Sequence, residues 1–355
     1  MSDVKLIVDT GYAKTRHGEK PIFTEGLYQL SNNCYSWMVP NGSWGETNIG
    51  LIDCNGKSVL VDTCWDVNLT MQMLNMMQPV LSRSPIETVI NTHSDGDHCW
   101  GNQLFKDRQI IATNGCKNQM HHVKPQSMTG LKTGCKALRY LPIAGINHFS
   151  NYMLDMMSPY DYKNIEITSP TQTFETEHCL NVNGKEIILY EVGPAHTSGD
   201  AIVYIPDESV VYAGDIAFIG ETPVMWSGPI EGIVSALQKV LDLNAKIMIP
   251  GHGPMARRKD IQRLIEFWNF SYEQLHYYFQ KDFEPHLAAS AVLKSEEYLR
   301  SAFAQWGNQE RMVTNATTLY RHWGADLSSL PEPLGTMNLM RKQACVAHDF
   351  VTSKH

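Results

Sequence analysis

The segment NTHSDGDH at residues 91–98 decides the fold class of this chain and indicates its chemistry. It follows the apolar run TVI at residues 88–90, which is typical of a buried strand. Side chains of metal-binding types recur within it: His93, Asp95, Asp97 and His98. Imidazole and carboxylate groups both bind divalent metals, and a tight loop at a strand end can direct them to one point. The segment therefore predicts a metal site at the end of a strand.

Three more residues of these types occur downstream, each in a short motif that contains glycine. They are His196 in GPAHTSGD (193–200), Asp215 in YAGD (212–215) and His252 in PGHGP (250–254). Glycine beside a ligand lets the backbone turn sharply without a Cβ clash. A single histidine is more often an ordinary core or surface residue, but the motifs together predict a common metal centre.

Apolar segments predict an α/β architecture in two blocks. The first has strands near residues 26–30, 34–39, 47–53 and 59–61, a helix over 68–82 and a strand at 88–90. The second has strands near 186–192, 201–205 and 210–213, a helix over 230–243 and a strand at 246–250. In both blocks the ligand-type residues follow strands, and the chemistry of such folds lies at strand ends.

In this order the motifs resemble those of the metallo-β-lactamase superfamily, over about residues 22–255. The resemblance implies an αβ/βα sandwich of two mixed β-sheets flanked by helices, with a dinuclear metal centre. By motif position, one metal would be bound by His93, Asp95 and His196, and the other by Asp97, His98 and His252, with Asp215 bridging them. Asp97 and Asp215 would also act in catalysis.

The first motif departs from the family pattern at one position. The usual sequence is His-x-His-x-Asp-His, whereas this chain has Asp95 in place of the second histidine. Asp95 either binds a metal or, with its shorter side chain, orients a bound water. An added carboxylate lowers the Lewis acidity of the metals and favours a higher oxidation state. We therefore expect two metal ions per chain (zinc, iron or manganese), with Asp95 favouring iron.

Residues around the motifs have expected supporting roles. Asp62, at the end of a strand, would fix the metal loop without binding the metal. Trp100 and Trp226 lie near ligand loops and are expected to be pocket walls, while Cys99 is expected to be a core residue.

The chain divides into a metal-binding domain over residues 1–255 and a helical extension over 256–355. An irregular insertion at about 114–165 is either a lid or pocket wall, or a peripheral helical decoration. In the extension, helices are expected over 260–283, 285–292, 295–306 and 310–323, and the tail from Leu330 as an extended arm. The aromatic residues of the extension would serve core or dimer packing, or would close over a bulky apolar substrate.

Composition narrows the function classes. The 355 residues have a formal charge of −8 without a Lys/Arg-rich run, so we expect no nucleic-acid partner. No apolar run approaches the roughly 20 residues that span a bilayer, and no signal-peptide pattern is seen, so we expect a cytoplasmic protein without a membrane partner. The eight cysteines are scattered, as is usual for buried thiols in a reducing compartment.

Three functions are compatible with these residues. The first is a dinuclear hydrolase, in which a metal-bridging hydroxide attacks an ester, thioester, lactone or amide carbonyl. The second is a non-haem di-iron, oxygen-dependent monooxygenase or other oxidoreductase, which Asp95 favours. The third is a binding or regulatory protein with a degenerate site. The expected partner is a small molecule that is bulky, apolar, or linked to a carrier or coenzyme A, and a homodimer through the extension is compatible with its aromatic content.

Overall fold

Two mixed β-sheets form the centre of the fold. The computed structural model describes residues 4–327 and 330–352. The first sheet contains, in order, β1 (Lys5–Asp9), β2 (Gly26–Gln29), β3 (Cys34–Met38), β4 (Ile49–Asp53), β5 (Ser58–Val61), β6 (Ile86–Ile90), β7 (Gln109–Thr113) and β8 (Gln172–Phe174). The second contains β13 (Ile247–Ile249), β12 (Val210–Tyr212), β11 (Ala201–Ile205), β10 (Lys185–Glu191) and β9 (Glu177–Val182). Strands β5 to β8 pair in parallel, as do β12 and β13, and the other pairs are antiparallel.

The two sheets pack face to face through apolar side chains. Their shared core includes Ile52, Val59 and Ile90 from the first sheet and Leu189, Val203 and Ile249 from the second. Each fully buried side chain of this size contributes roughly 1.5–3 kcal/mol. The predicted αβ/βα sandwich is thereby confirmed.

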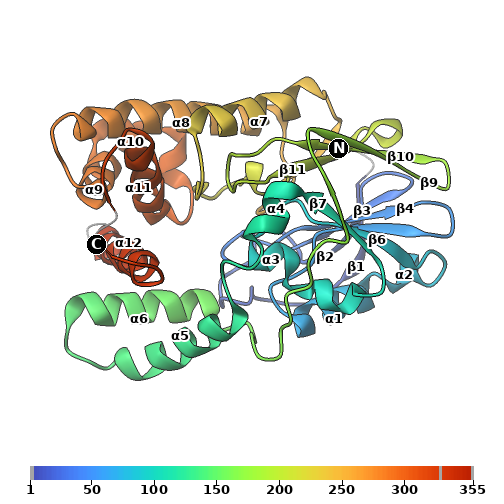
Figure 1. The fold of residues 1–355 in the computed structure, drawn as a ribbon, viewed down its shortest axis with the longest axis horizontal. Helices are drawn as coiled ribbons and strands as arrows, with labels where there is room; N and C mark the ends of the chain where they lie inside the picture. The colour runs from blue at the N-terminus through green and yellow to red at the C-terminus, as the bar shows by residue number, and fades with distance from the viewer. Residues whose placement is uncertain (1–3, 328–329, 353–355) are drawn as a thin grey trace.

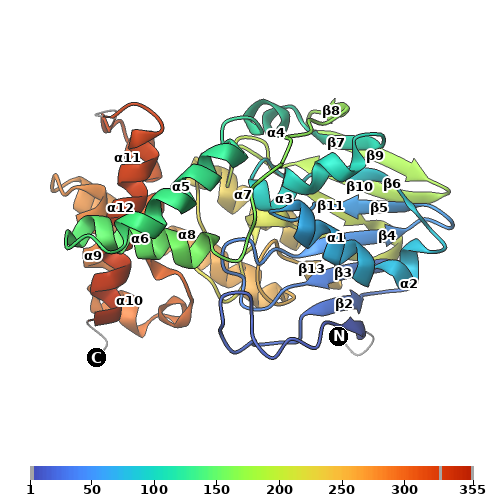
Figure 2. The same ribbon diagram turned by 90° about the horizontal axis from the view of Figure 1, so that it is seen from below.

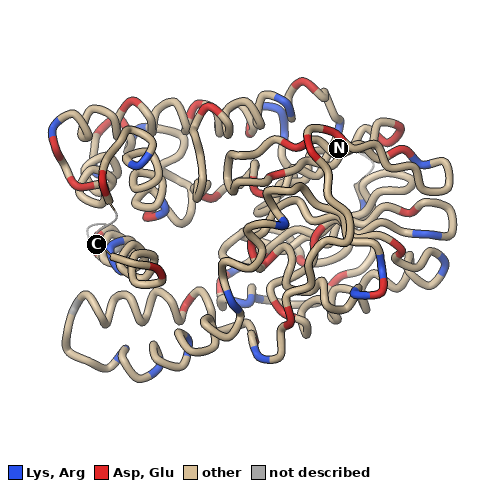
Figure 3. The backbone as a smooth tube through the Cα atoms, in the orientation of Figure 1, with Lys and Arg blue, Asp and Glu red and all other residues tan. Residues whose placement is uncertain are grey.

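Helices cover the outer faces of both sheets (Figures 1 and 2). On the first sheet lie α1 (Val67–Met76), α2 (Gln78–Leu81) and the short α3 (Gly96–Cys99), and on the second lie α7 (Ile230–Asp242) and α8 (Arg258–Phe279). The helix predicted over residues 68–82 is divided at Met77, because Pro79 has no backbone N–H to continue it and instead lies in the first turn of α2. Charged residues of both signs are interspersed over the molecule (Figure 3).

The insertion is more regular than its sequence suggested. It forms α4 (Asn114–Gln119) and an antiparallel pair, α5 (Pro125–Leu138) and α6 (Ala144–Met157), at the lower left of Figure 1. The extension continues after α8 with α9 (Pro285–Lys294), α10 (Glu296–Arg300) and α11 (Met312–His322). The single helix expected over 295–306 is interrupted at Ser301, which has an extended backbone.

The C-terminal tail is a helix, and the predicted extended arm is wrong. Helix α12 (Leu334–Thr352) packs against α6, between the insertion and the other helices of the extension (Figure 1). Pro331 and Pro333 precede its first residue, where a missing N–H costs nothing, so they mark a helix start rather than an extended segment. In the described part of the chain, no helix has the length and hydropathy needed to cross a membrane.

The extension shares its core with the sandwich. One continuous apolar cluster joins residues beneath the second sheet, such as Ile202 and Leu237, to Phe267 of α8, Val292 of α9 and Leu319 of α11. The division into two domains near residue 255 stays a prediction.

Candidate metal centre

The seven predicted ligands meet at one edge of the sandwich, and each is delivered by a loop that follows or joins strands. His93 and Asp95 lie in the loop after β6, and Asp97 and His98 belong to α3, which begins immediately afterwards. His196 lies between β10 and β11, Asp215 directly after β12, and His252 after β13. All four histidines and Asp215 are buried.

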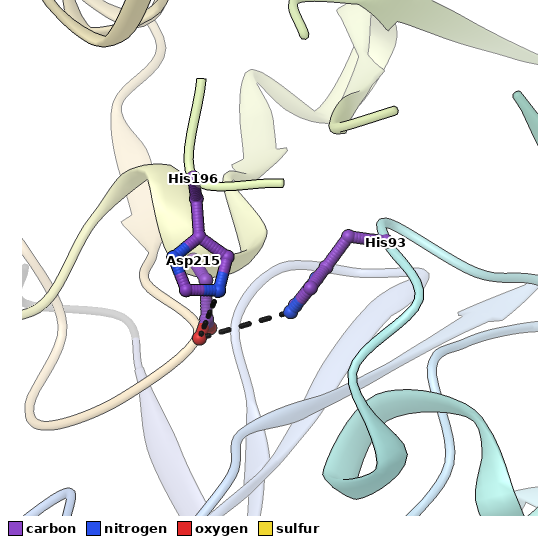
Figure 4. Close-up of side chains that lie close together, drawn as sticks. All are labelled: His93, His196 and Asp215. Carbon is purple, nitrogen blue, oxygen red and sulfur yellow. Dashed lines mark ion pairs between the residues drawn. The ribbon is translucent and has the colours of Figure 1, made fainter. Parts of the chain in front are cut away.

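The first group of donor atoms comprises His93, His196 and Asp215 (Figure 4). Asp215 Oδ2 lies 3.8 Å from His93 Nε2 and 3.4 Å from His196 Nε2. All three donor atoms fall within 4.8 Å of one another, which is close enough for one ion to contact all of them.

The second group comprises Asp97, His98 and His252. Asp97 Oδ2 lies 3.7 Å from His98 Nε2 and 3.5 Å from His252 Nε2. Asp215 also reaches this group, because its Oδ1 is 3.1 Å from His98 Nε2 and its Oδ2 is 3.3 Å from His252 Nε2. Asp215 therefore lies between the two groups, at the position of a bridging ligand.

Asp95 lies beside the first group but outside its tight triad. Its Oδ2 is 3.2 Å from His196 Nε2 and 4.0 Å from His93 Nε2. The same oxygen accepts a hydrogen bond from the Trp226 indole N–H at 3.1 Å. Direct binding of a metal by Asp95 stays a prediction.

The Nδ1 atom of every histidine in the site is held by a neighbour. Two of these neighbours are side chains: the Thr92 hydroxyl lies 2.9 Å from Nδ1 of His93, and Asp62 Oδ2 lies 2.9 Å from Nδ1 of His98. The other two are backbone carbonyls: that of Val224 lies 2.7 Å from Nδ1 of His196, and that of Glu46 lies 3.2 Å from Nδ1 of His252. Carbonyl and carboxylate oxygens only accept, and the Thr92 hydroxyl already donates to Asp62, so each Nδ1 is the donor. Nε2 is thus the atom of each ring that would bind metal.

Unpartnered buried atoms show that these residues fit metal ions. Among the described residues, His93 Nε2, His98 Nε2 and Asp215 Oδ1 are buried and have no hydrogen-bond partner. Buried polar atoms nearly always have a partner, and an unpaired one costs free energy. Ions bound by imidazole nitrogen and carboxylate oxygen would satisfy all three atoms, and zinc, iron and manganese each accept this donor set.

Asp62 fixes the geometry of the metal loop. It accepts hydrogen bonds from Thr92 N and Thr92 Oγ1, both at 2.7 Å, as well as from His98. Its backbone has φ +67°, a left-handed conformation that costs free energy for a residue other than glycine. Burial raises the pKa of Asp62, opposed by the adjacent His98, so the hydrogen bonds help to keep the carboxylate charged.

Opposing charges set the protonation of the site before metal binds. Burial disfavours the charged form of His196, but its hydrogen bond to Asp95 and the charge of Asp215 raise its pKa to about 9. Burial lowers the pKa of His93 well below its ordinary value, and the neighbouring His98 adds to this effect. A metal must therefore displace a proton from His196 but not from His93.

A glycine permits the close approach of β13 to Asp215. A Cβ atom added at Gly251 would lie 1.9 Å from Asp215 Oδ1, so any side chain there would displace the carboxylate. Two further groups that the sequence analysis did not identify support the second metal position. Thr47 Oγ1 donates to Asp97 Oδ2 at 2.8 Å, and the Phe218 ring stacks on His252 with the centroids 5.0 Å apart.

A cavity of about 400 Å³ opens above these residues. Its walls are aromatic, formed by Trp44, Trp65, Trp100, Phe218 and Trp226. Its roof is apolar, formed by Met128 and Leu131 of α5, Phe149 and Met153 of α6, and Leu339 and Met340 of α12. The insertion is thus a pocket wall rather than a peripheral decoration, and the expected positions of Trp100 and Trp226 are confirmed. The polar lining includes Gln119, His122, Arg311 and Arg321, none of which lies in one of the ligand motifs.

The comparison with protein families agrees with this geometry. The family model of the metallo-beta-lactamase superfamily matches residues 42–252, which include all seven candidate ligands. The chain belongs to the metallo-beta-lactamase superfamily.

Two curated relatives of the chain are distant. The alpha subunit of 2,4-dinitroanisole O-demethylase from Nocardioides sp. (strain JS1661) is 22% identical over 240 residues, 66% of this chain and 60% of the relative. A beta-lactamase-like protein 2 homolog from Caenorhabditis elegans is 25% identical over 211 residues, 59% of this chain and 56% of the relative.

A solved structure with a similar fold covers more of the chain. The stereoselective inverting sec-alkylsulfatase Pisa1 from Pseudomonas sp. aligns with 88% of this chain, with a TM-score of 0.60 and 15% identity. The aligned region is 52% of that protein, so this chain spans about half to three fifths of the length of these three proteins. At this identity the likeness shows the fold, not the reaction.

Proposed function

We propose that the protein is a metal-dependent hydrolase that cleaves an ester, thioester, lactone or amide bond in a small, largely apolar molecule. The observation that carries the proposal is the position of the seven ligand-type residues at the floor of an aromatic pocket. When bound, a pair of divalent metals supplies a water nucleophile at neutral pH and polarises the bond to be cleaved. The other requirements of hydrolysis fall to the residues of the chain itself.

Asp97 is the residue we assign to proton transfer. Its side chain lines the cavity and is 16% exposed, whereas that of Asp215 is 5% exposed. The hydrogen bond from Thr47 fixes the orientation of its carboxylate. Asp97 would accept a proton from the attacking water and return it to the leaving group, as a positioned general base does.

The pocket walls would select the substrate. Trp44, Trp65 and Phe218 exclude water and offer flat apolar surfaces, while methionines in the roof adapt to irregular shapes. The names of the relatives support a small-molecule substrate, because they describe an O-demethylase and an alkylsulfatase. They do not bear on which bond this protein cleaves.

A second candidate is a di-iron, oxygen-dependent oxidoreductase with the same ligands. Asp95 favours it, since Asp95, Asp97 and Asp215 together place three carboxylates around two metal positions. Anionic oxygen ligands stabilise ferric iron more than zinc.

One experiment separates these candidates. Protein expressed with both iron and zinc available is analysed for metal, and then assayed against ester, thioester, lactone and amide substrates under air and under nitrogen. The proposal predicts zinc or manganese and hydrolysis that does not depend on oxygen. About two irons per chain, oxygen consumption and no hydrolysis would favour the oxidoreductase, and a protein that binds no metal would favour a degenerate, regulatory site.

The variant Asp95→His restores the usual superfamily motif. In a hydrolase we expect hydrolysis to be kept or increased, because an imidazole leaves the metals with greater Lewis acidity. In a di-iron oxidoreductase the same change should abolish turnover and shift the metal content toward zinc. Asp107→His, at an exposed position after the same motif, is the matched control.

A further inference from the structure

A buried arginine from the helical extension faces the same cavity. Arg311 ends the 3-10 helix η5 (Gln309–Arg311), directly before α11, and is 3% exposed. It lines the cavity together with Phe218 and His252. A cation so deeply buried is unusual unless another group compensates its charge.

The contacts of Arg311 place it close to the metal ligands. Its guanidinium carbon is 5.5 Å from the centroid of the Phe218 ring, and that ring stacks on His252. Arg311 Nη1 donates to the Thr222 carbonyl at 3.1 Å, which anchors the side chain. Arg311 Nε is buried and has no hydrogen-bond partner among the described residues. The arginine is therefore held in position with donor capacity left over.

The charge of Arg311 is only partly balanced within the protein. The two carboxyl groups that feel it are Glu221 and Glu310, and within the described ranges neither forms an ion pair with it at 4.0 Å or less. Burial raises the pKa of Glu221 to about 7, against the influence of Arg311, and also raises the pKa of Glu310. Both groups therefore hold protons more readily than usual and balance the guanidinium charge less than two fully ionised carboxylates in direct contact would.

Other charged residues at the cavity do not cancel this effect. Arg321, which is exposed, adds a second positive charge to the lining. Glu332, also exposed, adds one negative charge to the lining, which offsets that of Arg321 and leaves the charge of Arg311, and its Oε2 accepts hydrogen bonds from Thr336 in the first turn of α12. The floor carries the carboxylates, and bound metals would neutralise them.

We propose that Arg311 binds an oxyanion group of the substrate. This contact would determine which bond of the substrate lies over the metal-ligand residues at the floor of the cavity. This inference rests on the proposed function for the reaction, but not for the binding itself. A guanidinium recognises carboxylate and sulfonate or sulfate oxygens through charge-assisted hydrogen bonds. The substrate class is then an amphipathic anion, with its apolar body between the tryptophans and its charged group at Arg311.

Binding of non-reactive probes tests the inference without turnover. Naphthalene-2-carboxylate, its neutral counterpart naphthalene-2-carboxamide, and naphthalene-2-sulfonate are titrated into the metal-loaded protein and followed by calorimetry. We expect the carboxylate or the sulfonate to bind at least tenfold more tightly than the carboxamide, and the stronger of the two identifies the preferred oxyanion. Equal affinities for the anions and the carboxamide would overturn the inference.

Variants assign the effect to Arg311 rather than to the metals. In Arg311→Gln with unchanged metal content, anion affinity should fall about 10- to 100-fold while carboxamide affinity is kept. Arg311→Lys should be intermediate, because it keeps the charge but not the planar fork. Arg300→Gln, which removes an exposed arginine paired with Glu296, is the control and should match the unchanged protein.

The outcomes distinguish the two proposals. Anion affinity that is unchanged in Arg311→Gln and Arg311→Lys would overturn the role of Arg311, even if the protein hydrolyses esters. Anion binding through Arg311 in a protein that hydrolyses nothing would leave the binding site in place and reject the hydrolase. If Arg311→Gln does not fold, the lysine variant still decides, since full affinity there would exclude recognition by the guanidinium fork.

Discussion

The metal floor and the helical roof of the pocket are built in different ways. The floor consists of the seven ligand-type residues on short loops at strand ends, with each imidazole fixed through its Nδ1 atom. The roof consists of side chains from α5, α6 and α12, which come from two distant parts of the chain and meet only in the folded protein. Local geometry thus positions the candidate ligands, whereas long-range helix packing shapes the cavity above them.

The roof has its own polar core. Tyr152 of α6 donates to Glu310 Oε1 at 3.0 Å and accepts from Gln343 Nε2 of α12 at 2.7 Å. Thr314 of α11 donates to Gln343 Oε1 at 2.7 Å. This network joins the insertion to the extension without contacting the floor, so the two regions can be perturbed separately.

The largest expected effect follows from breaking the floor at its centre. In Asp215→Asn the carboxylate between both donor groups is lost, and we expect at most one bound metal per chain. Hydrolytic activity should fall about a thousandfold or more, because metal catalysis contributes several kcal/mol. Metal analysis measures the number of bound ions. Assays with the substrate identified for the unchanged protein measure the loss of hydrolytic rate. Two metals and near-normal rates would contradict a bridging role, and Asp107→Asn is the control.

A substitution that destabilises the helical roof should leave metal binding at the floor unchanged. Gln343→Leu removes a partner of both Tyr152 and Thr314, and unsatisfied buried groups should lower the free energy of unfolding by about 3 kcal/mol. Urea unfolding measures the loss, and exposed Gln280→Leu is the control. Metal content should not change. If metal is lost as well, floor and roof are coupled and the contrast between them fails.

Substitution of Asp62, which contacts the candidate ligand His98, should have a smaller effect on metal binding than substitution of a ligand. Asp62→Asn keeps a residue that tolerates positive φ but removes the carboxylate that orients His98. We expect metal affinity to fall about 10- to 100-fold, as for other partners of metal-binding histidines. Competition with a chelator measures it. Unaltered affinity would show that the loop is held without Asp62.

The smallest effect concerns pH. Glu221 has a pKa of about 7 in the folded protein, above its value in an unfolded chain, so folding favours the protonated form. Stability should therefore decline as pH rises from about 4.5 to 7, because the unfolded chain ionises first. Glu221→Gln should remove this decline and be about 1–2 kcal/mol more stable than the unchanged protein at pH 8. Unfolding measured at pH 5 and pH 8 checks this, and equal slopes for both proteins would reject it.

The floor was predictable because its signals are local. Residues 91–98 combine ligand types with a preceding strand, and the downstream motifs repeat the same arrangement, so the sequence names six residues that the structure groups into two donor sets and a seventh, Asp95, that lies beside them. Their binding of metal stays a prediction. The superfamily and its sandwich fold followed from the same motifs, and the family comparison confirms both.

The roof, and the groups that support the floor from distant parts of the chain, were not predictable because their determinants are far apart in sequence. Arg311 looks like an ordinary charged residue at a helix start, and it is buried only in the folded protein, where it contacts Thr222 and Phe218. Thr47 acquires its role from Asp97, 50 positions away. Pro331 and Pro333 appeared to continue an extended tail, because the spacing that buries Met340 and Ala344 in α12 is weak without its partner α6.

One contact of the floor also concerns the order of synthesis. His252 forms an isolated β-bridge with Thr47, and its Nδ1 donates to the carbonyl of Glu46. Residues 46–47 are translated early, whereas His252, which contacts them in the folded protein, is translated much later. A nascent chain in which His252 is not yet translated, or is still inside the ribosome, has only some of the metal-ligand residues. If the site binds two metals as proposed, full loading would follow translation of the second sheet, and any metal captured earlier would be held by an incomplete and exchangeable set of ligands.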